Sequence, residues 1–583
     1  MSGPVTPDAV RGPGDPVWTQ HYDPTVPSHV AIPSRNLPDA IEESVRTWPN
    51  RTAFIHYGAR ISYAQFWELT GRFAATLTRD GFRPGDRLAL YLPNCPAHPI
   101  ALLGALRIGV TAVQVSPLYI AQDLSHLLSD AQPKGIVTLE ILYPNIEKLP
   151  PNDRPGLAYV ARFRDFYPAH LRPFVNFVLR RRKLSTRYPT GPEVHPWRQA
   201  VAAAGPFSPN PVDPQQSVAV FQYTGGTTGV PKAAMLSHRN LLANALQCRA
   251  WFNTLPAGTS TVLAAIPFFH IYGLTVALTY PLLEGATIVL QTRPDPDEVL
   301  KLIRRYRPSE FPGVPSFYQA INHHPDVAKY DIRSIRVCVS GSAPLPLEVA
   351  RRFEELTGGH VIEGYGLTEA SPVTHANPIF GERRTGSVGL PVPETDQKVV
   401  DLETGTRTLG PGERGEIAVR GPQVMLGYYH RPDETAMVLR DGWLYTGDVG
   451  YIDSDGYAFI VDRKKDMIDV GGMKVYPREV EEVLLQHPGI RDAAAVGVPD
   501  ERLGEVVHAV VVPNAGTTLT PKDVIDFVRE RIAHYKAPRT VEFRTELPRS
   551  GVQKVLRRTL RDDASRAMGG ATPTAPARAD PSQ

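Results

Sequence analysis

The chain has 583 residues. This length is too great for a single hydrophobic core, so we expect two to four packed units. Its composition, 42% apolar and 21% charged, is typical of a globular enzyme. The 63 basic and 60 acidic side chains leave a formal net charge of only +3. A net charge this small provides no strong electrostatic attraction for a nucleic acid, which argues against a nucleic-acid-binding protein.

The three cysteines indicate neither a metal site nor a disulfide framework. Cys95, Cys248 and Cys338 lie far apart, and none belongs to a CxxC motif or a Cys/His cluster. We therefore expect free, buried thiols in a reducing, cytoplasmic compartment. Residues 1–16 lack the apolar stretch of a signal peptide.

The N-terminal part of the chain predicts an arm followed by α/β structure. Residues 1–36 are rich in Pro and Gly and are predicted to form a loose arm. From residue 37 to about 140, helix-like and strand-like runs alternate. Residues 105–119, for example, contain a helix end, a glycine, a buried strand and a proline turn. This alternation predicts βαβ units and a mostly parallel sheet.

A basic segment at residues 162–187 interrupts this pattern. It mixes apolar and basic side chains, namely Phe163, Phe166, Phe174, Phe177 and Leu179 with Arg162, Arg164, Arg172, Arg180, Arg181, Arg182 and Lys183. A basic amphipathic segment can lie on an anionic bilayer. We favour the alternative, a helix packed on the domain with a solvated basic face, because a charge run alone is weak evidence.

The strongest local signal is the decapeptide YTGGTTGVPK, Tyr223 to Lys232. It follows a predicted buried strand, VAVFQ, and a predicted helix, SHRNLLANALQ, comes soon after. Glycines free the backbone to wrap around phosphate oxygens, while hydroxyls and a lysine supply donors and charge. These residues are Thr224, Gly225, Gly226, Thr227, Thr228, Gly229 and Lys232. The spacing differs from a Walker A loop, which disfavours a P-loop kinase or ATPase.

The apolar stretch at residues 259–283 contains no Lys, Arg, Asp or Glu. It is long enough to cross a bilayer, but Pro267, His270, Gly273 and Pro281 divide it into pieces. We therefore predict buried strand and helix segments rather than a membrane span.

The second half of the chain becomes β-rich after about residue 385 and α+β after about 463. We predict an α/β protein with a large N-terminal domain of packed α/β subdomains plus a β-rich subdomain, followed by a small mobile α+β C-terminal domain. The predicted boundaries are a loose arm at 1–36, the large domain at 37–462, a small lid domain at 463–565 and a disordered tail at 566–583.

Eight further motifs follow the decapeptide. They are PFFHIYG (267–273), FPGVPSFY (311–318), VSGSAPLP (339–346), EGYGLTEASP (363–372), GWLYTGDVG (442–450), DRKKDMI (462–468), GGMKVYPREVE (471–481) and LPRSGVQKVLRR (547–558). In this order they resemble the motifs of the adenylate-forming superfamily, over roughly residues 37–562. The resemblance implies an AMP-forming ligase, which activates a carboxylic acid with ATP as an adenylate and passes it to coenzyme A.

The resemblance also implies a nucleotide site assembled from several motifs. Asp448 is similar to the aspartate that accepts hydrogen bonds from the ribose hydroxyls, with Arg463 as its companion, and Tyr365 resembles the flat surface for adenine. The remaining implied ATP and AMP contacts are Thr224, Gly225, Gly226, Thr227, Thr228, Gly229, Lys232, Gly341, Ser342, Ala343, Pro344, Gly364, Gly366, Thr368, Ile460 and Lys554.

Four residues have implied catalytic roles: Lys554, Thr228, Glu369 and His270. Glu369 resembles the ligand of Mg²⁺, a hard cation that favours oxygen ligands when it bridges phosphates. Lys554 resembles the lysine that neutralises charge developing between the carboxylate and the α-phosphate. The family usually has Gly directly before this lysine, whereas this chain has Gln553, which puts the adenylation rate in doubt.

The remaining implied sites concern the acyl group, the thiol and the hinge. His270 resembles the aromatic gate between the acyl pocket and the thiol tunnel, and the implied pocket residues are Phe269, His270, Gly273 and Gly341. The implied coenzyme A contacts are Gly471, Gly472 and Lys474. Lys465 resembles the pivot about which the small domain rotates.

The match is closest to bacterial long-chain fatty acid ligases, which implies a long-chain substrate. The sequence leaves open a medium-chain or aryl acid such as coumarate, an acyl-AMP ligase that feeds a carrier protein, and a non-catalytic acyl-nucleotide- or membrane-binding homologue. It also leaves open the oligomeric state, with a homodimer as one option, and a peripheral contact with the inner face of the membrane. No nucleic-acid partner is expected.

Overall fold

The computed structural model of the chain describes residues 14–181, 188–202, 205, 207, 209, 212–224, 231–252, 254–293, 295–500, 502–549 and 554–567. The chain divides into two compact units. Unit 1 comprises Met1–Lys398, Ala418–Thr446 and Ile452–Ala458, and unit 2 comprises Val399–Ile417, Gly447–Tyr451 and Phe459–Gln583. The chain passes several times from one unit to the other, so this division is more complex than one cut at residue 462, and the predicted domain boundaries stay predictions.

The largest sheet of unit 1 has eight strands in the order β18-β9-β8-β4-β3-β5-β6-β7. The six strands from β8 to β7 run parallel, as the alternating pattern predicted. β9 is antiparallel to β8, and β18 to β9. The strands are β3 (Arg87–Tyr91), β4 (Thr111–Val115), β5 (Gly135–Leu139), β6 (Leu157–Ala161), β7 (Val194–Pro196), β8 (Val218–Thr224), β9 (Lys232–Ser237) and β18 (Gly427–Tyr428).

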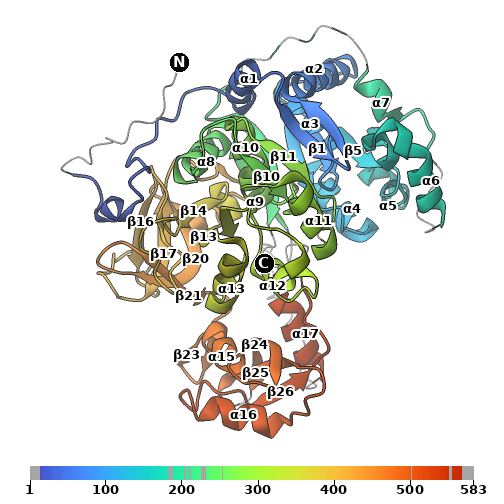
Figure 1. Cartoon of the computed structure of the whole chain (residues 1–583). Helices are drawn as coiled ribbons and strands as arrows, with labels where there is room; N and C mark the ends of the chain where they lie inside the picture. Colours follow the sequence, from blue (N-terminus) through green and yellow to red (C-terminus); the bar gives the residue numbers. More distant parts are fainter. Residues whose placement is uncertain are drawn as a thin grey trace, which may run out of the picture. The chain divides into compact units, whose positions relative to one another are not determined.

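Helices flank this sheet (Figure 1). Leu124, Leu127 and Leu128 of α4 form one core with the sheet residues Val113 and Ile136. Burial of such side chains is the main stabilising contribution to the fold. The helices before and around this sheet are α1 (Leu37–Thr47), α2 (Tyr63–Arg79), α3 (Ala97–Leu106), α4 (Ala121–Ala131), α5 (Tyr143–Glu147), α6 (Arg172–Arg181), α7 (Trp197–Ala200) and α8 (His238–Trp251).

Two further sheets complete the core of unit 1. One has the order β10-β11-β1-β2, and the other has the order β12-β13-β14-β15. Their strands are β1 (Thr52–His56), β2 (Ala59–Ser62), β10 (Thr261–Ala264), β11 (Thr287–Leu290), β12 (Val337–Ser340), β13 (His360–Gly366), β14 (Val373–Ala376) and β15 (Leu390–Pro391). The helices beside them are α11 (Pro296–Tyr306), α12 (Pro315–Asn322) and α13 (Leu347–Thr357).

The apolar stretch at residues 259–283 is broken as predicted. It contains β10, α9 (Ile271–Leu274), the π-helical turn Thr275–Thr279 and α10 (Tyr280–Leu283). Among the residues that the structure describes, no helix has both the length and the apolar run needed to cross a bilayer. The prediction for the thiols is also confirmed, because Cys95, Cys248 and Cys338 are free and buried.

Unit 2 contains the C-terminal α+β fold. Its sheet has the order β23-β22-β25-β24, and β26 pairs with β25. The elements are β22 (Ile468–Val470), β23 (Met473–Val475), α15 (Pro477–Leu484), β24 (Ile490–Asp500), β25 (Gly504–Pro513), α16 (Pro521–Arg529), β26 (Thr540–Phe543) and α17 (Arg557–Ala567). The β-rich region before it holds β16 (Asp396–Val400), β17 (Gly415–Arg420), α14 (Pro432–Val438), β19 (Leu439–Arg440), β20 (Trp443–Ile452) and β21 (Ala458–Arg463).

The described part of the N-terminal arm is packed rather than loose. Asp23 is 2% exposed and accepts hydrogen bonds from the backbone N–H groups of Ile379 (2.7 Å), Phe380 (3.1 Å) and Gly381 (2.6 Å). The Tyr22 ring lies edge-on to the Trp251 ring at 4.9 Å. Composition predicted looseness from Pro and Gly, but it could not show that one carboxylate would find three distant backbone donors.

We expect Asp23→Ala to lower the free energy of unfolding by about 1–3 kcal/mol, because a buried carboxylate and its hydrogen bonds to three N–H groups would be lost. Urea unfolding followed by fluorescence measures this. Asp326→Ala, which removes an exposed partner of Lys329, should leave the midpoint unchanged. An Asp23→Ala midpoint equal to that of the wild type would show that the arm adds no stability.

Candidate active site

The glycine-rich decapeptide begins and ends on two paired strands. Thr224 is the last residue of β8 and lies opposite Lys232, the first residue of β9. The loop therefore joins two antiparallel strands, whereas a Walker A loop leads into a helix. Gly225, Gly226, Thr227, Thr228 and Gly229 lie outside the described residues.

Lys232 faces a set of carboxylates and one aromatic ring. Its Nζ forms an ion pair with Glu434 of α14 and lies 5.3 Å from the centre of the Tyr428 ring. Partial burial lowers the pKa of Lys232, while the negative charge of Glu369 raises it. A cation that is already paired with a carboxylate has to exchange that partner when it binds an anionic phosphate. Sequence reasoning missed Glu434, since no local motif connects it to the decapeptide.

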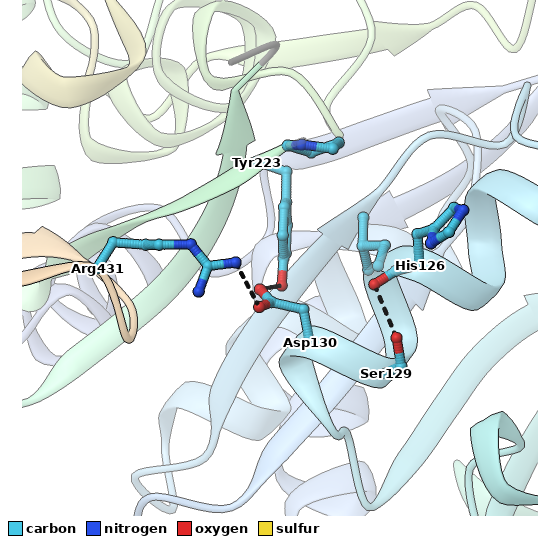
Figure 2. Close-up of a pocket in the computed structure, with 7 residues that line it drawn as sticks. His126, Ser129, Asp130, Tyr223 and Arg431 are labelled. Atoms are coloured by element: carbon cyan, nitrogen blue, oxygen red, sulfur yellow. Dashed lines mark hydrogen bonds and ion pairs between the residues drawn. The ribbon is translucent and has the colours of Figure 1, made fainter. Parts of the chain in front are cut away.

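A second set of side chains connects β8 with α4 and with Arg431. The Tyr223 hydroxyl donates to Asp130 of α4 (2.7 Å), and Arg431 lies 3.5 Å from the other oxygen of Asp130. Figure 2 shows Tyr223 and Arg431 converging on Asp130 from separate elements, in a pocket of about 260 Å³ that Pro231 also lines. Arg431 also lies 3.6 Å from Glu434. The residues before and after the loop are thus joined through a continuous polar network.

Glu369 lies close to these strands. It belongs to the 3₁₀ turn Thr368–Ala370, which packs against β8 and β9. The Tyr428 hydroxyl donates to its Oε1 (2.6 Å), which fixes the orientation of the carboxylate. The carboxylate of Glu369 is an oxygen ligand of the type that Mg²⁺ binds together with substrate phosphates, so this residue fits the predicted cation.

The predicted adenine-binding segments come together through strand pairing. β12 and β13 are parallel, and Ser340 pairs with Glu363. Gly341–Pro344 directly follow β12, and Gly364–Gly366 are the last residues of β13, so both segments lie at the same edge of the sheet, as expected for a site at the carboxyl ends of parallel strands. Tyr365 lies within the second segment, at 5.7 Å from the His375 ring.

A hydrogen bond connects the PFFHIYG segment to β8. Gln222, the residue directly before the decapeptide, donates from Nε2 to the carbonyl oxygen of Phe269 (2.9 Å). His270 caps α9, and its Nδ1 accepts a hydrogen bond from the N–H of Tyr272 (3.3 Å). This contact gives His270 a structural function whatever its part in catalysis.

Two predicted pocket glycines have structural explanations. A Cβ on Gly273 would lie 2.1 Å from the carbonyl oxygen of Pro267, so no side chain fits there. A Cβ on Gly341 would lie 3.1 Å from the Tyr272 ring. Both glycines permit close packing of the chain, and their place in an acyl pocket stays a prediction.

Unit 2 brings the predicted ribose residues and the predicted catalytic lysine together. Asp448 is 3% exposed, and its Oδ1 lies 3.3 Å from Nε of Arg463. Lys554 is 106 residues further along the chain than Asp448, yet the charges of Asp448 and Arg463 both shift its pKa. Burial lowers the pKa of Lys554 to about 7, and the positive charge of Arg463 lowers it further, whereas the Asp448 carboxylate raises it.

The predicted hinge and coenzyme A residues lie between Arg463 and Lys554 in the sequence. Asp462 accepts hydrogen bonds from the N–H groups of Arg463 (2.7 Å) and Arg478 (2.8 Å), and burial raises the pKa of Asp462 to about 6. The charge of Lys465 also acts on Lys554. Arg478 further donates to the carbonyl oxygen of Ile460 (2.9 Å).

Gly471 and Gly472 form the two-residue turn between β22 and β23, and both have positive φ angles, 60° and 86°. Such hairpin turns require residues that adopt positive φ, so the turn alone explains both glycines. Lys474 pairs with Asp469 (2.7 Å). Their contact with coenzyme A stays a prediction. Gln553 and Gly551 lie outside the described residues.

Comparison with known proteins decides the family. Residues 41–429 match the AMP-binding enzyme family, and residues 479–554 match the AMP-binding enzyme C-terminal domain. The chain belongs to the AMP-binding enzyme family. The first match alone covers more than half of the sequence, and it includes the glycine-rich decapeptide and Glu369. Lys554 is the last residue of the second match.

Full-length relatives of this AMP-binding enzyme are similar throughout. A long-chain-fatty-acid–CoA ligase of Bacillus subtilis (strain 168) is 41% identical over 548 residues, which are 94% of this chain and 98% of the relative. One of Escherichia coli O157:H7 is 38% identical over 557 residues with the same coverage. The crystal structure of ATP-bound MatB from Rhodopseudomonas palustris superposes with a TM-score of 0.80 at 30% identity, covering 91% of this chain and 99% of that one.

We expect Asp448→Ala to weaken ATP binding on the order of 10–100-fold, because a buried charged acceptor is lost and Arg463 is left without its carboxylate. Isothermal titration with ATP measures the affinity. Asp526→Ala removes an exposed carboxylate of the same unit, paired with Lys522, and should bind ATP like the wild type. An unchanged affinity of Asp448→Ala would remove Asp448 from the nucleotide site.

Proposed function

We propose that this enzyme joins a long-chain fatty acid to coenzyme A while it cleaves ATP to AMP and pyrophosphate. The observation that carries the proposal is the similarity to long-chain-fatty-acid–CoA ligases, at 38–41% identity over 94% of this chain and 98% of each relative. The retained Lys232, Glu369, Asp448 and Lys554 support an active enzyme rather than a binding homologue.

In the first half-reaction, a carboxylate oxygen of the acid attacks the α-phosphorus of ATP, and the bond to the bridging oxygen of pyrophosphate breaks. Two anions must approach each other, so positive charge at the phosphates lowers the barrier. We assign this charge to Lys232 and Lys554, with Thr224, Thr227, Thr228 and the loop glycines Gly225, Gly226 and Gly229 as further phosphate contacts. Glu369 would hold Mg²⁺, which supplies additional positive charge to the phosphate oxygens.

The nucleoside part of ATP requires a diol contact and a flat surface. We assign the ribose hydroxyls to Asp448 and Arg463, because an ionised acceptor suits a diol. The base would lie against Tyr365. The other assigned contacts are Gly341, Ser342, Ala343, Pro344, Gly364, Gly366, Thr368 and Ile460.

In the second half-reaction, the thiol sulfur of coenzyme A attacks the acyl carbonyl, and AMP leaves with the bridging oxygen. We assign the acyl pocket and its gate to Phe269, His270, Gly273 and Gly341, and the coenzyme A contacts to Gly471, Gly472 and Lys474. The small domain, proposed as residues 463–565, would change its orientation about Lys465 between the two half-reactions. Residues 37–462 would form the large domain.

Three further properties complete the proposal. The free, buried cysteines support a cytoplasmic location. The weak solubility of long acyl chains supports peripheral contact with the inner face of the membrane. A homodimer is one option for the assembly, and sedimentation of the purified protein decides it.

Release of AMP with ATP, Mg²⁺ and coenzyme A, measured over saturated acids from acetate to stearate and with oleate and coumarate, tests the proposal. We expect the highest kcat/KM with long chains and strict dependence on coenzyme A. A maximum at medium chains or at coumarate would replace the proposed substrate within the same chemistry. AMP release that requires an acyl carrier protein instead of coenzyme A would indicate a carrier-loading ligase, and no AMP with any acid would indicate a binding homologue.

A further inference from the structure

The helix α6 of the basic segment carries its large apolar side chains on the outside. Phe174 is 65% exposed, Phe177 is 60% exposed, and Leu171, just before the helix, is 36% exposed. The smaller Val175 is the buried residue of the helix, at 8%. Two exposed phenylalanines on one helix are unusual, because burial of each ring would stabilise the fold.

The inner side of α6 is fixed to the rest of unit 1, so the outward orientation is a property of the fold. Asn176 accepts a hydrogen bond from Arg164 (3.0 Å). Arg172 donates to the carbonyl oxygen of Tyr167 (3.1 Å), and the Tyr167 ring stacks on Tyr57 of the β1–β2 turn at 4.3 Å. These contacts settle which face of the helix turns to solvent.

Residues three and four apart lie on one face of a helix. Leu171, Phe174, Phe177 and Arg181 have this spacing, and Arg180 flanks them, exposed like Arg181. We call these five residues the α6 face. Figure 1 shows α6 at the margin of unit 1.

The segment that contains the α6 face is mostly basic. Residues 162–181 contain the arginines 162, 164, 172, 180 and 181, and Asp165 is their one acidic residue. Asp165 lies 3.5 Å from Arg198 of α7 and has an 11% exposed side chain, so it faces away from solvent. Exposed apolar rings beside the exposed Arg180 and Arg181 match the two layers of an anionic bilayer, which are the acyl chains and the headgroup phosphates.

We infer that the α6 face docks on an anionic phospholipid bilayer, with Phe174 and Phe177 inserted among the acyl chains and Arg180 and Arg181 on headgroup phosphates. The inference rests on the proposed function for its purpose, since a long-chain acid is concentrated in bilayers and is taken up from there. The two arginines make docking electrostatic, so affinity falls as salt rises. One exposed helix face gives reversible rather than permanent binding.

Co-sedimentation of the full-length protein with vesicles of phosphatidylcholine, with and without 30% phosphatidylglycerol, tests the inference. We expect binding to the anionic vesicles and little binding to the neutral ones. Phe174→Asp/Phe177→Asp should weaken binding on the order of 100-fold through lost insertion. Arg180→Gln/Arg181→Gln should weaken it about fivefold per arginine. Both pairs are exposed, so thermal melting should match the wild type.

A matched control replaces exposed apolar residues elsewhere in unit 1. Leu118 and Ile120 are 67% and 60% exposed and precede α4. Leu118→Asp/Ile120→Asp should bind vesicles like the wild type. Wild-type binding that the phenylalanine variant retains, or absence of wild-type binding to anionic vesicles, would overturn the inference. A dimer that the phenylalanine variant loses, without vesicle binding by the wild type, would assign the face to a second copy of the chain.

AMP formation in the absence of vesicles, with an acid below its solubility limit, separates this inference from the proposed function. The α6 variants should match the wild type in that assay. A wild type that binds vesicles but forms no AMP would refute the proposed function and leave the docking face standing. A wild type that forms AMP but ignores vesicles would refute the docking face alone.

Discussion

Lys554→Ala should slow formation of the acyl-adenylate by about 10²–10³-fold, the usual effect of removing one preorganised charge from a transition state. Transfer of a preformed acyl-adenylate to coenzyme A should stay within a few fold of the wild type, since the proposed role of Lys554 is to neutralise charge where the carboxylate attacks the α-phosphorus, and the transfer step makes no bond to phosphorus. ATP–pyrophosphate exchange measures the first half-reaction, and thioester formation from synthetic acyl-AMP measures the second. Equal losses in both assays would contradict the assigned role.

Lys522→Ala is the control for this experiment. Lys522 belongs to the same unit, has an exposed side chain and pairs with Asp526. Its removal should leave both half-reactions unchanged. A large effect of Lys522→Ala would show that the assay reports general damage to unit 2 rather than loss of a catalytic charge.

The pKa of Lys554 adds an expected pH dependence. Burial lowers this pKa to about 7, so the side chain carries its proton below neutral pH and loses it as the pH rises. Because adenylation requires the ammonium form, kcat/KM for adenylation should fall through about pH 7 in the free enzyme. Lys554→Arg keeps the positive charge at high pH and should abolish this decline, whatever its absolute rate. A decline that persists in Lys554→Arg would assign it to another group.

Glu369→Gln should reduce adenylation by about 100-fold or more and shift the dependence on Mg²⁺ to higher concentrations, because a neutral amide replaces an anionic oxygen ligand. Tyr428→Phe removes the hydroxyl that donates to Glu369 and should cost about tenfold, since it loosens the ligand without removing it. ATP–pyrophosphate exchange over a Mg²⁺ titration measures both variants. An unchanged Mg²⁺ dependence of Glu369→Gln would place the cation elsewhere.

Helices and strands were predictable where the hydrophobic periodicity agrees with the positions of proline and glycine. VAVFQ became part of β8, and the proline and glycine pattern of residues 259–283 correctly predicted separate buried segments. β9 was missed as a strand because KAAMLS is a short apolar run without turn residues, and its strand conformation depends on pairing with β8 and β18. Pairing partners far along the chain are not visible in a local pattern.

The candidate site was predictable as residue types and less so as contacts. The resemblance implied that Gly341 and Gly364 contact the nucleotide, and the structure has both at the carboxyl ends of the neighbouring parallel strands β12 and β13, while the nucleotide contact itself stays a prediction. Glu434, the partner of Lys232, lies outside every motif. The reason for Gly273 also emerged only from the fold, where a carbonyl oxygen occupies the space of a side chain. Contacts of this kind follow from tertiary packing, which no single motif encodes.

Oxygen transfer from the acid tests the central claim, that the acid is activated as an adenylate. The enzyme is incubated with ATP, Mg²⁺, coenzyme A and palmitate labelled with ¹⁸O in both carboxylate oxygens, and the nucleotide product is analysed by mass spectrometry. The account predicts AMP with one ¹⁸O atom for each thioester formed, because the attacking oxygen stays on the α-phosphorus when the thiol displaces AMP. ADP together with labelled phosphate, or AMP without label, would contradict it.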